Sequence, residues 1–141
     1  RSFNIHCVLL QVKIVMSVLS IKNPIFYIGC PPAWEIVKRL GYNYLVYECT
    51  DLFEEMPGAN KSYIASLDNE LTVSADLVLY VNKGLWKEGV KKNKNSLFIG
   101  HGVDFELFAD SVKSTYIPDD IVTIRKPIVG FFGDIYFDFC W

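Results

Sequence analysis

The sequence predicts an α/β fold, a doubly wound parallel sheet with helices joining its strands. Short runs rich in Val, Ile, Tyr and Phe alternate with segments of helical spacing. The runs are nearly continuous in apolar residues, which is typical of strands buried on both faces of a parallel sheet. This β-α-β-α order implies right-handed crossovers and an open sheet. The expected strands are residues 25–30, 44–50, 77–82, 97–100 and 128–132.

Three segments between these runs have the spacing of helices. Residues 34–40 place apolar side chains at three-residue intervals before Gly41, which is well placed as a C-terminal cap. Residues 64–75 follow an i, i+3, i+7 pattern, with Asp68 and Glu70 expected to face solvent. Residues 85–90 form a shorter expected helix with lysines outward.

Composition and charge exclude two classes of protein. The chain has 141 residues, of which 51% are hydrophobic and 15% aromatic, unlike a disordered segment. Its net charge of -2 argues against nucleic acid as a partner, because phosphate binding needs concentrated Lys and Arg. The lysines of residues 87–94 include an acidic neighbour and lack interleaved aromatics, so they indicate a solvated helix face.

The cysteines give no sign of a metal site. The chain has four, without a CxxC pair and without histidines at zinc-finger spacing. Cys30 and Cys49 lie in apolar runs, where cysteine behaves as a small hydrophobe. We therefore expect a reducing, cytoplasmic setting and no metal cofactor.

Residues 5–21 are the most apolar stretch of the chain. They include His6, Gln11 and Lys13, whereas a spanning helix wants about 20 predominantly apolar residues with few or no charges. The stretch favours a buried helix or a peripheral one at the membrane surface over a span.

The distribution of strands and linker-like sequence predicts an incomplete two-domain arrangement. No glycine-rich turn follows a first strand, and residues 110–126 are polar and punctuated by proline. We interpret residues 1–109 as the later part of one domain, 110–126 as an interdomain linker and 127–141 as the opening strand of a second domain. Asp104 is placed to cap a short helix before the linker.

Four short motifs occur in order along the chain. They are Tyr-Glu-Cys-Thr-Asp at 47–51, Ala-Asp at 75–76, His-Gly-Val-Asp at 101–104 and Pro-Ile-Val-Gly-Phe-Phe-Gly at 127–133. From about residue 24 onward, the chain resembles retaining glycosyltransferases of the GT-B fold, related to bacterial cell-surface polysaccharide enzymes. The resemblance implies two Rossmann-like domains. It also implies transfer of a sugar from a nucleotide-sugar donor to a glycan or lipid-linked acceptor, at the cytoplasmic face of the membrane and without a metal.

The chain departs from that family's pattern in three ways. His101 stands where the family has Asn, and Glu48 stands where it has Asp. The family's donor-sugar motif, two glutamates seven residues apart, would lie beyond Trp141. We therefore expect these residues alone to be inactive as a transferase.

The candidate catalytic residues are Asp51 and Glu48, at the end of an expected strand. Ligands of open α/β sheets bind beyond the carboxyl ends of the strands, so both carboxylates are expected to face the cleft. The resemblance implies a position near the acceptor, where a carboxylate orients or deprotonates a hydroxyl. Alternatively, Asp51 caps the following turn.

The candidate donor-binding residues are Gly133, Asp134, Gly130, His101 and Gly102. The resemblance places the loop at Gly133 close to the donor diphosphate, where backbone N–H groups bind anions, and Asp134 next to a sugar hydroxyl. Gly130 alternatively serves tight packing within a strand. His101 and Gly102 follow a strand, where glycine allows close backbone approach and His101 either bonds a phosphate or sugar or preserves a turn.

Two other classes of protein stay open. One is a truncated, non-catalytic remnant of such an enzyme, which would expose strand edges and apolar surface. The other is an unrelated dinucleotide-binding domain, which needs a phosphate-binding glycine turn after its first strand. Pro31 and Pro32 disfavour it, because proline lacks the N–H donor that such a turn uses.

Overall fold

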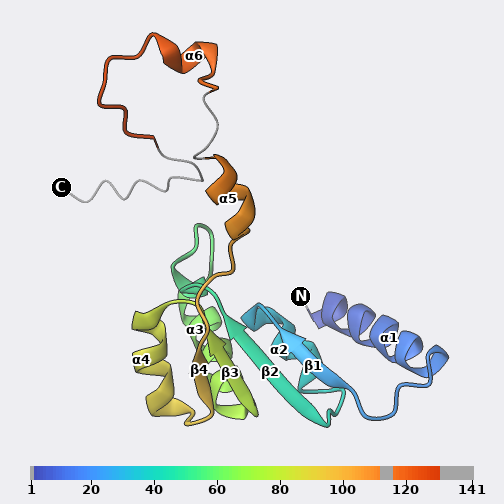
Figure 1. Ribbon diagram of the computed structural model, residues 1–141. Helices are drawn as coiled ribbons and strands as arrows, with labels where there is room; N and C mark the ends of the chain where they lie inside the picture. The colour runs from blue at the N-terminus through green and yellow to red at the C-terminus, as the bar shows by residue number, and fades with distance from the viewer. Residues whose placement is uncertain (1, 112–115, 131–141) are drawn as a thin grey trace. The chain divides into compact units, whose positions relative to one another are not determined.

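Four parallel strands form one sheet in the computed structural model, which describes residues 2–111 and 116–130 (Figure 1). They lie side by side in chain order, β1-β2-β3-β4, each hydrogen-bonded to the next. The predicted α/β class and the first four predicted strands are therefore confirmed. The strands are β1 (Ile25–Ile28), β2 (Tyr44–Cys49), β3 (Leu77–Tyr80) and β4 (Ser96–Phe98).

The helices fall where the apolar spacing predicted them. Asn60 caps the N-terminus of α3 (Lys61–Ser74) and Asn82 caps that of α4 (Lys83–Lys92). The side chain of each accepts hydrogen bonding from the backbone N–H groups of the first turn. Gly41, after α2, has a φ of +69°, a conformation that glycine adopts without strain. The elements are α1 (Ser2–Val18), η1 (Pro31–Ala33), α2 (Trp34–Val37), η2 (Phe53–Glu55), α3 (Lys61–Ser74) and α4 (Lys83–Lys92).

The hydrophobic core lies on one face of the sheet. Leu45 and Tyr47 of β2 are fully buried and belong to the same cluster as Leu67 and Leu71 of α3. The alternate residues of the strands point to the opposite face and are half-buried or exposed. On that opposite face Ile25 is 66% exposed, Tyr27 59% and Leu97 54%.

This one-sided core corrects the prediction that the strands are buried on both faces. Because the strand order follows the chain order, every crossover moves in the same direction across the sheet. Right-handed crossovers that advance in one direction lie on one face. Among the described residues, the face that carries Tyr27 and Leu97 remains open. We call it the open face, and the face packed on α3 the covered face.

Helix α1 is apolar around most of its circumference and packs against α2. Leu10 and Ile14 are among its exposed apolar residues. Within the described part of the chain, none of the helices has the length and apolar character that a membrane span requires.

The chain divides into two compact units, Arg1–Gly102 and Val103–Trp141. The second unit contains α5 (Phe105–Ser111) and α6 (Asp119–Val122). Asp104 accepts a hydrogen bond of 3.0 Å from the Leu107 N–H, which confirms its predicted capping role. Of the fifth predicted strand, residues 128–130 are irregular and 131–132 lie outside the described residues, so the proposed domain boundaries stay a prediction.

Candidate functional site

A cavity of about 110 Å³ lies on the covered face, where β2 and β3 end. The helices α3 and α4 form its sides, and the loop after β2 forms part of its rim. Four of its lining residues carry carboxylates and one is a lysine, so its charge is predominantly negative. The charged residues are Asp51, Glu54, Asp68, Glu88 and Lys92.

Close packing of Tyr80 on α4 shapes this cavity. Tyr80 is buried at the end of β3, and its ring lies against the backbone of Gly89. A Cβ atom at Gly89 would overlap the phenol and would lie 2.7 Å from its Cε2 atom. The absence of a side chain at Gly89 therefore allows α4 to approach the sheet. Burial raises the pKa of Tyr80 to about 12, so its phenol is neutral at physiological pH.

Asp68 is a half-buried carboxylate in the lining of the cavity. Tyr47, fully buried on β2, donates its phenol hydrogen to Asp68 Oδ1 across 2.5 Å. Burial raises the pKa of the Asp68 carboxyl, the Tyr47 hydrogen bond lowers it and nearby Glu54 raises it further. The neighbouring Cys49 is buried as well, which raises its thiol pKa to about 11 and leaves it protonated at neutral pH.

The position of Asp68 corrects one prediction and supplies a site residue that the sequence analysis missed. Asp68 was expected to face solvent, yet it is half-buried and turned toward β2. It lies four residues after Ile64 and four before buried Thr72, on the flank of the apolar stripe of α3. That spacing could have indicated a carboxylate at the edge of the core.

The two candidate catalytic carboxylates lie on opposite sides of the sheet. Asp51 is exposed in the wall of the cavity. Glu48 belongs to β2 and points to the open face, where it accepts a hydrogen bond of 2.7 Å from the Tyr27 hydroxyl. That hydrogen bond is the main cause of the raised pKa of Tyr27. Within this unit the structure therefore does not bring Asp51 and Glu48 into a shared site.

The candidate donor-binding residues are distributed over both units. His101 and Gly102 are exposed and follow β4 after Gly100, whose φ is +70°. Gly130 is exposed in the second unit, and a Cβ there would meet nothing within 4 Å. The remaining two candidates, Gly133 and Asp134, lie outside the described residues.

The Ala-Asp motif at 75–76 has a structural role. The side chain of Asp76 accepts a hydrogen bond of 2.8 Å from the backbone N–H of Leu45, at the start of β2. The Asp76 N–H in turn donates to the Leu45 carbonyl across 2.9 Å. This reciprocal pair fixes the alignment of β2 and β3, on which the position of the cavity depends.

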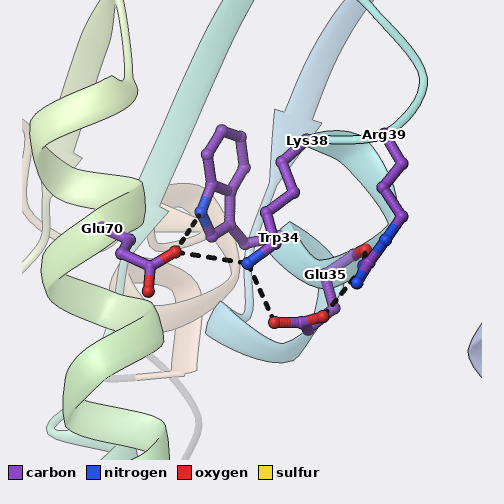
Figure 2. A network of polar contacts seen from close by, with 5 residues as sticks. All are labelled: Trp34, Glu35, Lys38, Arg39 and Glu70. Atoms are coloured by element: carbon purple, nitrogen blue, oxygen red, sulfur yellow. Dashed lines mark hydrogen bonds and ion pairs between the residues drawn. The ribbon is translucent and has the colours of Figure 1, made fainter. Parts of the chain in front are cut away.

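A polar network links α2 to α3 on the covered face (Figure 2). Glu70 accepts from the Trp34 indole N–H and from Lys38, each at 3.3 Å. Lys38 also pairs with Glu35, which is bound by Arg39 as well. Lys38 and Arg39 hold the pKa of the Glu35 carboxyl below its usual range. All the charges of this network have protein partners, which indicates a structural cross-link between the helices.

Comparison with known proteins identifies no relative. No protein-family model, no curated protein and no solved structure matches the chain. Within the described residues, no group of three or more His, Cys, Asp or Glu is arranged to hold a metal ion. The polar side chains that line the cavity are carboxylates, a lysine, a thiol and buried hydroxyl groups.

Proposed function

We propose that this chain is part of a retaining glycosyltransferase of the GT-B fold, acting in cell-surface polysaccharide synthesis. The observation that carries the proposal is the placement of the ordered motifs. Asp51 follows the carboxyl end of β2, and His101 follows β4 after a short turn. That end of a parallel sheet is where open α/β folds bind their ligands.

In this proposal Asp51 acts on the acceptor. Its exposed carboxylate orients the hydroxyl of a glycan or lipid-linked acceptor, which attacks the anomeric carbon on the face from which the diphosphate leaves. Asp51 takes the hydroxyl proton as the new C–O bond forms and the C–O bond to the diphosphate breaks. The residues that we propose contact the nucleotide-sugar donor are His101, Gly102, Gly130, Gly133 and Asp134. Helix dipoles and backbone N–H groups stabilise the leaving diphosphate, so transfer proceeds without a metal. We place the protein at the cytoplasmic face of the membrane, with α1 as the peripheral contact.

The proposal includes double winding of the sheet. Parallel sheets normally have both faces covered, whereas this one has an apolar open face. In a doubly wound domain, further strands continue the sheet beyond β1, and the helices that join those strands cover the open face. Glu48 then lies beneath those helices and has a structural role with Tyr27 rather than a catalytic one.

The test is sugar transfer by the complete reading frame that contains residues 1–141. Mass spectrometry of acceptors offered with a panel of nucleotide sugars detects the product. We expect transfer, and we expect Asp51→Asn to reduce kcat by about 10²–10⁴-fold, as loss of a general base does. Asp119→Asn, an exposed carboxylate of α6, is the matched control and should retain full activity. Equal activity of the two variants would contradict the role of Asp51.

A specific observation also favours a second candidate, a non-catalytic remnant of such an enzyme. The open face and α1 present apolar side chains to solvent, as a partial fold would. Such a remnant binds no nucleotide sugar and self-associates through these surfaces. Light scattering of the 141-residue chain separates the candidates when it is read together with the transfer assay. Self-association without transfer by the complete reading frame supports the remnant.

A further inference from the structure

The cavity between α3 and α4 concentrates acidic groups from four different elements. Asp51 comes from the loop after β2, Glu54 from η2, Asp68 from α3 and Glu88 from α4. Lys92 of α4 is the cation among the lining residues. Glu88 is exposed and paired with Lys91 at 2.6 Å, whereas Asp68 is half-buried.

The hydrogen-bond donor to Asp68 is neutral, whereas the cation Lys92 lines the same cavity. The phenol of Tyr47 donates to Asp68, and the protonated thiol of Cys49 and the phenol of Tyr80 line the same inner region. A carboxylate that is partly removed from water is less stable in its ionised form. Repulsion from Glu54 acts in the same direction, while Lys92 and Tyr47 oppose it.

We infer that this cavity is a proton-sensitive contact, closed while Asp68 holds a proton and opened to water when Asp68 ionises. Ionisation adds a negative charge to a cavity that already contains Asp51, Glu54 and Glu88. The resulting repulsion acts between α3 and its neighbours, because these three carboxylates lie on the rim loop, η2 and α4. The ionised carboxylate also requires hydration, and the cavity is its route to water.

The direction of the pH dependence follows from the linkage between protonation and folding. The pKa of Asp68 is raised in the folded chain. Its contribution to stability is therefore fully present below the ordinary aspartate value of about 4, and it is lost as the pH rises through the folded value. Glu35 acts in the opposite direction, because its pKa is lowered. The difference in pH-dependent stability between the wild type and an Asp68 variant separates the contribution of Asp68 from that of Glu35.

The experiment measures the Asp68 titration and the opening of α4 together, in the 141-residue chain. Carboxyl-carbon NMR follows Asp68, and hydrogen exchange, corrected for intrinsic rates, follows the amides of α4 between about pH 4 and pH 8. We expect Asp68 to titrate above about 4 and α4 to open more as it does, by up to about tenfold for each unit of pKa shift. Asp68→Asn retains an acceptor for Tyr47 and should remove this dependence.

Two further variants make the result decisive. Glu88→Gln removes a rim charge of the same sign and should leave the Asp68-linked opening in place. Tyr47→Phe removes the hydrogen bond that lowers the pKa of Asp68, so the Asp68 midpoint should rise. A midpoint at or below the ordinary value, or an unchanged pH dependence in Asp68→Asn, would overturn the inference. So would exchange of α4 that is independent of the Asp68 titration.

Discussion

Replacement of Gly89 by alanine tests the packing that shapes the cavity. In a solvated helix this change stabilises by about 1 kcal/mol, because alanine has the higher helix propensity. Here the new methyl group would overlap the buried ring of Tyr80. Overpacking a core costs about 1–3 kcal/mol, and complete loss of a buried aromatic costs about 3–5 kcal/mol. We therefore expect a net loss of about 2–4 kcal/mol, which is the upper limit of each range less the propensity gain of about 1 kcal/mol.

Thermal unfolding followed by circular dichroism measures this loss. In a unit of about 100 residues, each kcal/mol lowers Tm by about 4–8 °C. Gly84→Ala, in the first turn of the same helix, is the comparison variant. Its Cβ would meet the Asn82 Oδ1 at 3.0 Å, so it can weaken the cap of α4 but meets no buried ring. Combining Gly89→Ala with Tyr80→Leu should recover part of the loss, since the shorter side chain makes room. Equal stability of Gly89→Ala and Gly84→Ala would refute the reasoning.

Three further predictions concern the contacts that position the cavity. Asp76→Ala leaves the buried Leu45 N–H without its acceptor and should cost about 1–3 kcal/mol, whereas Asp76→Asn should retain most of the stability in chemical denaturation. Asn93→Ala removes donors to the Thr72 and Ala75 carbonyls, at 2.9 and 2.7 Å, and should lower the urea midpoint measurably. Glu70→Gln removes the charge from a partly exposed pair with Lys38 but retains an acceptor for the Trp34 indole N–H, so it should change stability by less than about 1 kcal/mol, a limit that a larger loss would contradict.

The order of the strands and helices was predictable because each element has a strong local pattern. The strand at 44–49 is a nearly continuous apolar run with two tyrosines and a valine, and α3 has an apolar stripe whose N-terminal end is marked by the Asn60 cap. The prediction that both faces of the sheet are covered was wrong for the described residues. Apolar runs do not reveal which direction the crossovers take, and this direction decides which face the helices cover.

The site was less predictable than the fold, because it depends on contacts between distant residues. The short run at 44–50 contained Glu48, whose position within the strand directs it to the open face, away from Asp51. Gly89 lies inside a helix, where nothing local indicates that Tyr80 packs against it. Asp68 was assigned to solvent from its charge alone, although its spacing placed it beside the core.

Calorimetric titration of the complete reading frame with nucleoside diphosphates tests the proposed function most directly. A nucleoside diphosphate is the part of the donor that a GT-B enzyme binds without needing the correct sugar or acceptor. We predict saturable binding of at least one of UDP, GDP and ADP in a metal-free buffer. Absence of binding by a folded, monodisperse protein would contradict the proposal that residues 1–141 belong to a glycosyltransferase.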